Sequence, residues 1–125
     1  MSRILVVDDN ADLCQAMMRL LRNFGYEVES AYDGEAALEA VWARPPDLVI
    51  LDVMMPKLDG LDVLARIKGD AARADVPVVM FSARHDPEVK EMALQRGAAD
   101  FWLKAAFDFN ELRNRTAALV GAPNA

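Results

Sequence analysis

The chain has 125 residues, 54% of them hydrophobic, and a formal net charge of -6. This length suits one compact domain with its own core and is short for two. The acidic balance, with a sequence pI near 4.7, disfavours direct binding to nucleic acid, and one cysteine with one histidine excludes an internal disulfide and disfavours a zinc site.

Five short apolar runs divide the chain, and each ends in polar or turn residues. The runs cover residues 4–7, 26–31, 48–51, 76–81 and 99–103. Three of them are apolar at consecutive positions, which is typical of strands covered on both faces in a parallel sheet. The first run is too short for a signal-peptide core or a membrane span. We therefore expect a cytoplasmic protein that does not enter a membrane.

Helical patterns alternate with these runs. The segment after Asp9 carries apolar residues at three- and four-residue spacing up to Phe24, and Gly25 suits a left-handed cap at its end. Asp59 and Asp86 are the expected N-caps of two later helices. The helices are expected within 10–25, 33–43, 59–69, 86–98 and 107–120. Five repeats of strand and helix predict a doubly wound α/β fold with a parallel sheet.

Residues with useful chemistry follow the strands, at the edge where open parallel sheets bind ligands. They are Asp8, Asp9, Asp52, Ser82 and Lys104. Asp52 ends a buried run, where an unpaired charge is costly. Three carboxylates at one edge repel one another unless a cation lies among them, and oxygen ligands favour Mg²⁺. An aspartate can attack a phosphoryl group, and Mg²⁺, Lys104 and Ser82 could neutralise and position that group.

Four segments resemble the receiver domain of two-component response regulators. They are "ILVVDDN", "DLVILDVMMPKLDG", "VPVVMFSA" and "GAADFWLK", in the order and at the spacing of that family. The resemblance covers essentially the whole chain. It implies a flavodoxin-like receiver fold over residues 1–120, with five parallel strands in the order 2-1-3-4-5 and five helices. Residues 121–125 are then expected to be a flexible tail.

The resemblance also implies roles for individual residues. Asp52 is the implied phosphoacceptor, and Ser82 and Lys104 contact its phosphoryl group. The implied magnesium ligands are Asp8 through water, Asp9, Asp52 and the backbone carbonyl of Met54. Ser82 and Phe101 stand at the two switch positions, although Phe101 fits a plain core residue equally well. A helix cap with a solvated neighbour is the alternative reading of Asp8 and Asp9.

The implied function is Mg²⁺-dependent transfer of a phosphoryl group from a histidine kinase or phosphotransfer protein onto Asp52. Such a domain catalyses its own phosphorylation and slow dephosphorylation rather than turning over a substrate. Slow loss of phosphate is expected here because the apolar Met54 should hinder the attacking water. Phosphorylation would change the face formed by residues 86–98, 99–103 and 107–120, and with it the binding of a downstream protein or a second copy.

One position departs from the family. Ala105 replaces the proline that usually follows the lysine in a cis peptide bond, and a cis bond before a non-proline residue costs about 2.5–4 kcal/mol. The sequence leaves open whether the Lys104-Ala105 bond is trans or a strained cis bond. A degenerate receiver that binds partners without phosphorylation is therefore the alternative function. A haloacid-dehalogenase-type hydrolase is disfavoured by Met54, where a second acid is usual, and a flavin site is disfavoured by the acidic loop after residue 7.

Overall fold

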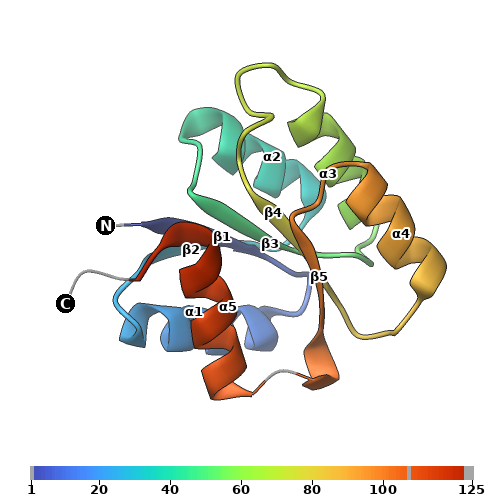
Figure 1. Ribbon diagram of the computed structural model, residues 1–125. Helices are drawn as coiled ribbons and strands as arrows, with labels where there is room; N and C mark the ends of the chain where they lie inside the picture. Colours follow the sequence, from blue (N-terminus) through green and yellow to red (C-terminus); the bar gives the residue numbers. More distant parts are fainter. Residues whose placement is uncertain (1, 107, 123–125) are drawn as a thin grey trace.

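The computed structural model describes residues 2–106 and 108–122, so residues 123–125 of the predicted tail lie outside the described part (Figure 1). Strands and helices alternate along the chain as predicted. The strands are β1 (Arg3–Val7), β2 (Glu27–Ala31), β3 (Leu48–Asp52), β4 (Val78–Ser82) and β5 (Asp100–Leu103). The helices are α1 (Ala11–Asn23), α2 (Gly34–Ala43), α3 (Gly60–Lys68), α4 (Pro87–Gln95), the short 3-10 helix η1 (Lys104–Ala106) and α5 (Phe109–Val120).

The sheet is parallel, with the order β2-β1-β3-β4-β5. This confirms the predicted fold class and strand order. Figure 1 shows α1 and α5 on one face of the sheet and α2, α3 and α4 on the other. Both faces of the central strands are thus covered, which explains their unbroken apolar runs.

Two hydrophobic clusters fill the space between the sheet and the helices. Successive residues of β1 alternate between them: Ile4 and Val6 pack on the side of α1 and α5, and Leu5 and Val7 pack on the other side. All five residues of β3 are buried, including the aspartate that ends it. Packing on both faces fixes the register of this strand and therefore the position of Asp52.

The five α-helices each begin at a side-chain cap. The caps are Asn10, Asp33, Asp59, Asp86 and Asp108, each accepting a hydrogen bond from a backbone N–H of the first turn. The expected caps Asp59 and Asp86 are confirmed. Gly25, after α1, has a φ of 102°, in the left-handed region expected for it.

Three strands, β2, β4 and β5, begin later than the apolar runs that predicted them. Tyr26 precedes β2, and its N–H bonds to the carbonyl of Leu21 at the end of α1. Val76 precedes β4, and its N–H closes a turn with Arg73. Both side chains are buried. Their apolar character therefore indicates burial and not pairing in the sheet. None of the helices in the described residues has the length and apolar character to span a membrane.

Candidate functional site

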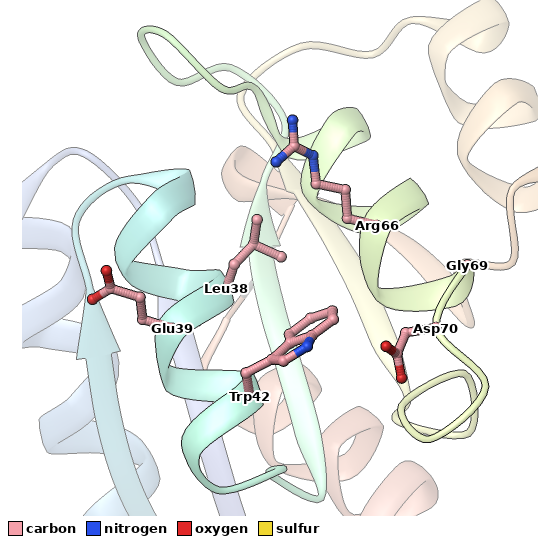
Figure 2. Close-up of a pocket in the computed structure, with 6 residues that line it drawn as sticks. All are labelled: Leu38, Glu39, Trp42, Arg66, Gly69 and Asp70. Atoms are coloured by element: carbon pink, nitrogen blue, oxygen red, sulfur yellow. The ribbon is translucent and has the colours of Figure 1, made fainter.

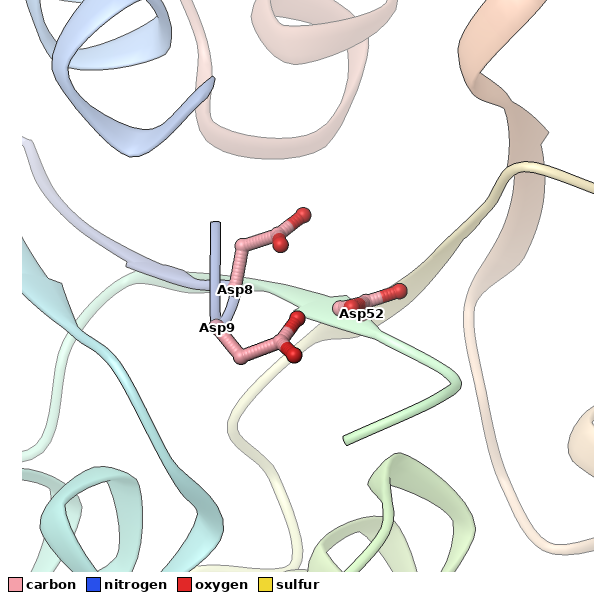
Figure 3. A group of neighbouring side chains, drawn as sticks. All are labelled: Asp8, Asp9 and Asp52. Atoms are coloured by element: carbon pink, nitrogen blue, oxygen red, sulfur yellow. The ribbon is translucent and has the colours of Figure 1, made fainter. Parts of the chain in front are cut away.

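Three carboxylates meet where β1 and β3 end (Figure 3). Asp8 and Asp9 follow β1, and Asp52 is the last residue of the adjacent β3. Each offers a carboxylate oxygen, and these oxygens all lie within 4.8 Å of one another. Asp8 and Asp52 are buried, whereas Asp9 is exposed. The structure thus brings together the three acidic residues that the sequence singled out.

The backbone after β1 holds Asp8 in place and leaves Asp9 available. The Asp8 N–H donates to the carbonyl of Ala31 at 3.2 Å, and Asp8 Oδ1 accepts the Asn10 N–H at 2.9 Å. Asn10 itself caps α1, because its side chain accepts the Leu13 N–H at 3.1 Å. The capping alternative for Asp8 and Asp9 is therefore wrong, and the burial of Asp8 requires another explanation.

Lys104 supplies positive charge to this cluster from the end of β5. Its Nζ lies 2.7 Å from Asp8 Oδ2 and 3.3 Å from Asp52 Oδ1. The described residues contain no cis peptide bond, so the Lys104-Ala105 bond, left open by the sequence, is trans. Residues Lys104–Ala106 form the short helix η1. Lys104 therefore reaches the carboxylates although Ala105 replaces the usual proline.

The charged groups at the site shift one another's pKa values. Burial, together with the neighbouring Asp8 carboxylate, raises the pKa of Asp52 to about 6, although Lys104 and the Met54 N–H act to lower it. Burial lowers the pKa of Lys104, but its bonds to Asp8 and Asp52 outweigh this and leave the pKa raised. Lys104 therefore carries its charge at neutral pH, and Asp52 ionises close to neutrality.

The remaining predicted site residues, Ser82, Met54 and Phe101, differ in their burial and hydrogen bonding. The Ser82 hydroxyl faces its own loop, donating to the Arg84 carbonyl at 2.9 Å and accepting the Arg84 N–H at 3.1 Å. The Met54 side chain is 67% exposed, while its N–H donates to Asp52 Oδ1 at 3.4 Å. Phe101 is buried in the cluster on the side of α2, α3 and α4. Within the described part of the chain, the hydrogen bonds to the Asp52 carboxylate come from the Met54 N–H and from Lys104.

Two features of the site lay beyond sequence reasoning. The first is the 2.7 Å pairing of Lys104 with Asp8, since the lysine was expected to serve Asp52. The second is Gly60, the first residue of α3, where a Cβ would overlap the backbone carbonyl of Asp52. The Asp-Gly pair after residue 58 is a signal that could have indicated such a close approach. Gly60 lets α3 begin directly against the end of β3.

The donor set fits a divalent cation. Three carboxylates with one ammonium leave an excess of negative charge, and oxygen donors at the open edge of a sheet suit a hard ion such as Mg²⁺. The cysteine behind the site does not alter this set. Cys14 is buried, its Sγ donates to the Asp8 carbonyl at 3.3 Å, and burial raises the pKa of its thiol to about 11. It is a core residue rather than a nucleophile.

Comparison with known proteins agrees with this geometry. Residues 4–117 match the family model of the response regulator receiver domain. The chain belongs to this family. A response regulator, MprA of Mycobacterium tuberculosis, is 40% identical over 118 residues, which cover 94% of this chain and 50% of MprA. The transcriptional regulatory protein PrrA of Mycobacterium bovis is also 40% identical, over 94% of this chain and 49% of PrrA.

Solved receiver structures share the fold. The chemotaxis protein CheY4 of Vibrio cholerae superposes with a TM-score of 0.88 at 28% identity, covering 95% of this chain and 98% of that one. The receiver domain of NtrX from Brucella abortus has a TM-score of 0.85 at 36% identity, covering 94% and 97%. This receiver domain spans about half the length of the curated relatives it matches. It is a response regulator receiver domain of two-component signalling, as its motifs predicted.

Proposed function

We propose that Asp52 accepts a phosphoryl group from the phosphohistidine of a histidine kinase or phosphotransfer protein. A carboxylate oxygen of Asp52 forms a bond to phosphorus while the phosphorus–nitrogen bond of phosphohistidine breaks. The imidazole nitrogen leaves with the electron pair of that bond and takes a proton from solvent, so the products are an aspartyl phosphate and a free histidine. The observation that carries the proposal is the convergence of three carboxylates and Lys104 at the carboxyl edge of the sheet.

The surroundings of Asp52 suit a nucleophile. Its Oδ1 accepts hydrogen bonds from Lys104 Nζ at 3.3 Å and from the Met54 N–H at 3.4 Å, whereas Oδ2 has no hydrogen bond within the described part of the chain. With its pKa raised to about 6, the carboxylate is ionised at pH 7 and more basic than an ordinary aspartate. Lys104 is close enough to neutralise charge on an incoming phosphoryl group.

We assign the magnesium site to Asp8, Asp9, Asp52 and the backbone carbonyl of Met54, with Asp8 acting through a water molecule. When bound, the ion neutralises charge on the transferred phosphoryl group. The protein residues position it: Asp8 is held by the Asn10 N–H, and the exposed Asp9 faces solvent, where an ion enters.

Phosphorylation then acts as a switch. An aspartyl phosphate carries about -1.5 to -2 of charge beside Lys104. Ser82 must exchange its bonds to Arg84 for one to the phosphoryl group, and Phe101 moves with it. The altered face is that of α4, β5 and α5, which binds a downstream protein or a second copy. We further propose that the receiver domain spans residues 1–120 and that residues 121–125 are a tail. We also propose that the protein is cytoplasmic.

A receiver that binds partners without phosphorylation is the second candidate. Ala105 after Lys104 is the feature that favours it, since the family usually has proline there. The contacts of Lys104 with Asp8 and Asp52 count against it, because the lysine reaches the acceptor with a trans bond.

A small-molecule phosphodonor distinguishes the two candidates. The native chain, Asp52→Asn and the exposed-residue control Asp62→Asn are each incubated with an acyl phosphate and Mg²⁺, and intact masses are read under acidic conditions. We expect the native chain and Asp62→Asn to gain one phosphoryl mass, and Asp52→Asn or a chelated sample to gain none. A folded native chain that gains no mass supports the phosphorylation-independent receiver instead.

A further inference from the structure

A groove of about 610 Å³ runs between α2 and α3, away from the carboxylates (Figure 2). It is lined by Leu38, Glu39 and Trp42 of α2 and by Arg66, Gly69 and Asp70 of α3 and the turn after it. Its volume is in the range of small-molecule sites. We call it the α2–α3 groove. None of the residues assigned above to phosphoryl transfer lines this groove.

An ordered, exposed indole forms the apolar part of this groove. Trp42 is 38% exposed, whereas the other tryptophan, Trp102, is fully buried. The Arg73 guanidinium lies 4.6 Å from the Trp42 ring centroid and donates to the Trp42 carbonyl at 3.1 Å. Figure 2 places the ring between Leu38 and Asp70. Because Arg73 already fixes the ring, a ligand would lose little entropy in ordering it.

A free cation lies at the other end of the groove. Arg66 forms no hydrogen bond or ion pair with any residue that the structure describes, and Asp62, one turn earlier on α3, does not pair with it. Figure 2 shows the Arg66 guanidinium above Leu38, on the side toward α2. A guanidinium in this position offers two parallel donors to a carboxylate.

The acidic residues of the groove do not neutralise Arg66. The Glu39 carboxylate points away from the groove in Figure 2. Asp70 Oδ1 pairs with Arg73 Nη1 at 3.3 Å and accepts the Ala72 N–H at 2.9 Å. The local charge available to a ligand is therefore positive at the Arg66 end, although the whole chain is acidic.

We propose that the α2–α3 groove binds a small carboxylate with an apolar or aromatic body. The carboxylate pairs with Arg66, and the body lies against Leu38 and the exposed face of Trp42. Complementary charge at one end and an ordered apolar surface at the other select this class over neutral or cationic molecules. The proposal goes beyond phosphoryl transfer and does not depend on Asp52.

An amide-resolved NMR titration of the full chain tests it with 3-phenylpropionate as the probe. The uncharged 3-phenylpropionamide is the matched ligand, and Arg96→Gln, a change of an exposed arginine after α4, is the matched variant. We expect saturable shifts confined to residues 36–43 and 66–73, with a dissociation constant on the order of 1 mM for a ligand of this size. Arg66→Gln and replacement of the acid by the amide should each weaken binding about tenfold, a loss of about 1.4 kcal/mol.

Trp42→Ala should weaken the binding of acid and amide alike, while Arg96→Gln should change neither. The native spectrum outside the groove reports whether each variant is folded. Shifts that do not saturate, an Arg66→Gln variant that binds as tightly as the native chain, or equal affinity for acid and amide would each overturn the proposal.

Discussion

The burial of Asp52 beside the Asp8 carboxylate predicts that Asp52→Asn is more stable than the native chain at pH 7 without metal. The pKa of Asp52 is raised from 3.8 to about 6, so this side chain ionises more easily in the unfolded chain. A pKa change of that size lowers the free energy of unfolding by about 3 kcal/mol at pH 7. Asp52 is only 5% exposed, so solvent screens little of it. Asparagine has a similar shape and no charge, and should recover about 3 kcal/mol of unfolding free energy.

The stability gain has a defined pH dependence. The native fold binds the Asp52 proton more tightly than the unfolded chain does, so ionisation of this group lowers stability as the pH rises from about 4 to about 6. Asparagine does not titrate. The difference between the two proteins should therefore shrink on acidification, to about half its neutral value at pH 5.

Urea unfolding with a chelator, at pH 7 and pH 5, measures this difference, and the fully buried Trp102 gives a fluorescence signal. Glu39→Gln, which changes an exposed carboxylate, serves as the control and should stay within about 0.5 kcal/mol of the native chain. Added Mg²⁺ should stabilise the native chain more than Asp52→Asn. A variant no more stable than the native chain at pH 7, or a gain that is the same at both pH values, would refute the reasoning.

Three other variants test the contacts around Asp52. Lys104→Met removes the ammonium between Asp8 and Asp52 and should lower the unfolding free energy by about 2 kcal/mol without metal; unchanged urea unfolding would contradict this. Gly60→Ala places a Cβ against the Asp52 carbonyl and should destabilise the chain by about 2 kcal/mol or more. It should also slow phosphorylation of the chain. A Gly60→Ala variant with the stability and the phosphorylation rate of the native chain would count against the predicted overlap. Met54→Asn should shorten the lifetime of the phosphorylated state, followed as loss of phosphoryl mass with time; a lifetime equal to or longer than native would argue against shielding by Met54.

Much of the fold could be predicted because it depends on local patterns. Spacing of apolar residues indicated the helices, and capping side chains such as Asp59 and Asp86 marked where two of them begin. Consecutive apolar residues indicated a sheet covered on both faces. Strand starts were predicted one or two residues too early where a buried residue precedes the strand, as Tyr26 and Val76 do. Burial leaves the same apolar signal whether or not a residue joins a strand.

The sequence allowed us to predict which residues form the candidate site, but not which contacts they make with one another. Asp8, Asp9 and Asp52 could be grouped because parallel strands end at one edge. The direction of the Ser82 hydroxyl, toward Arg84, and the choice of Asp8 as the nearer partner of Lys104 depend on side-chain torsions. The trans state of the Lys104-Ala105 bond depends on the geometry of the loop after β5. These features are set by tertiary packing and leave no trace in spacing or composition.

The same charge imbalance accounts for both the predicted instability and the proposed chemistry. One ammonium faces three carboxylates, two of them buried, so the metal-free domain retains uncompensated negative charge in a poorly solvated place. Neutralising Asp52 relieves that repulsion and also removes the proposed phosphoacceptor. A divalent cation would relieve it without chemical change, so the proposed binding of Mg²⁺ and the predicted instability of the metal-free domain have one origin. Variants that reduce the charge of the cluster should therefore gain stability and lose phosphorylation together, which is the pattern expected when a functional site is held in a strained state by the surrounding fold.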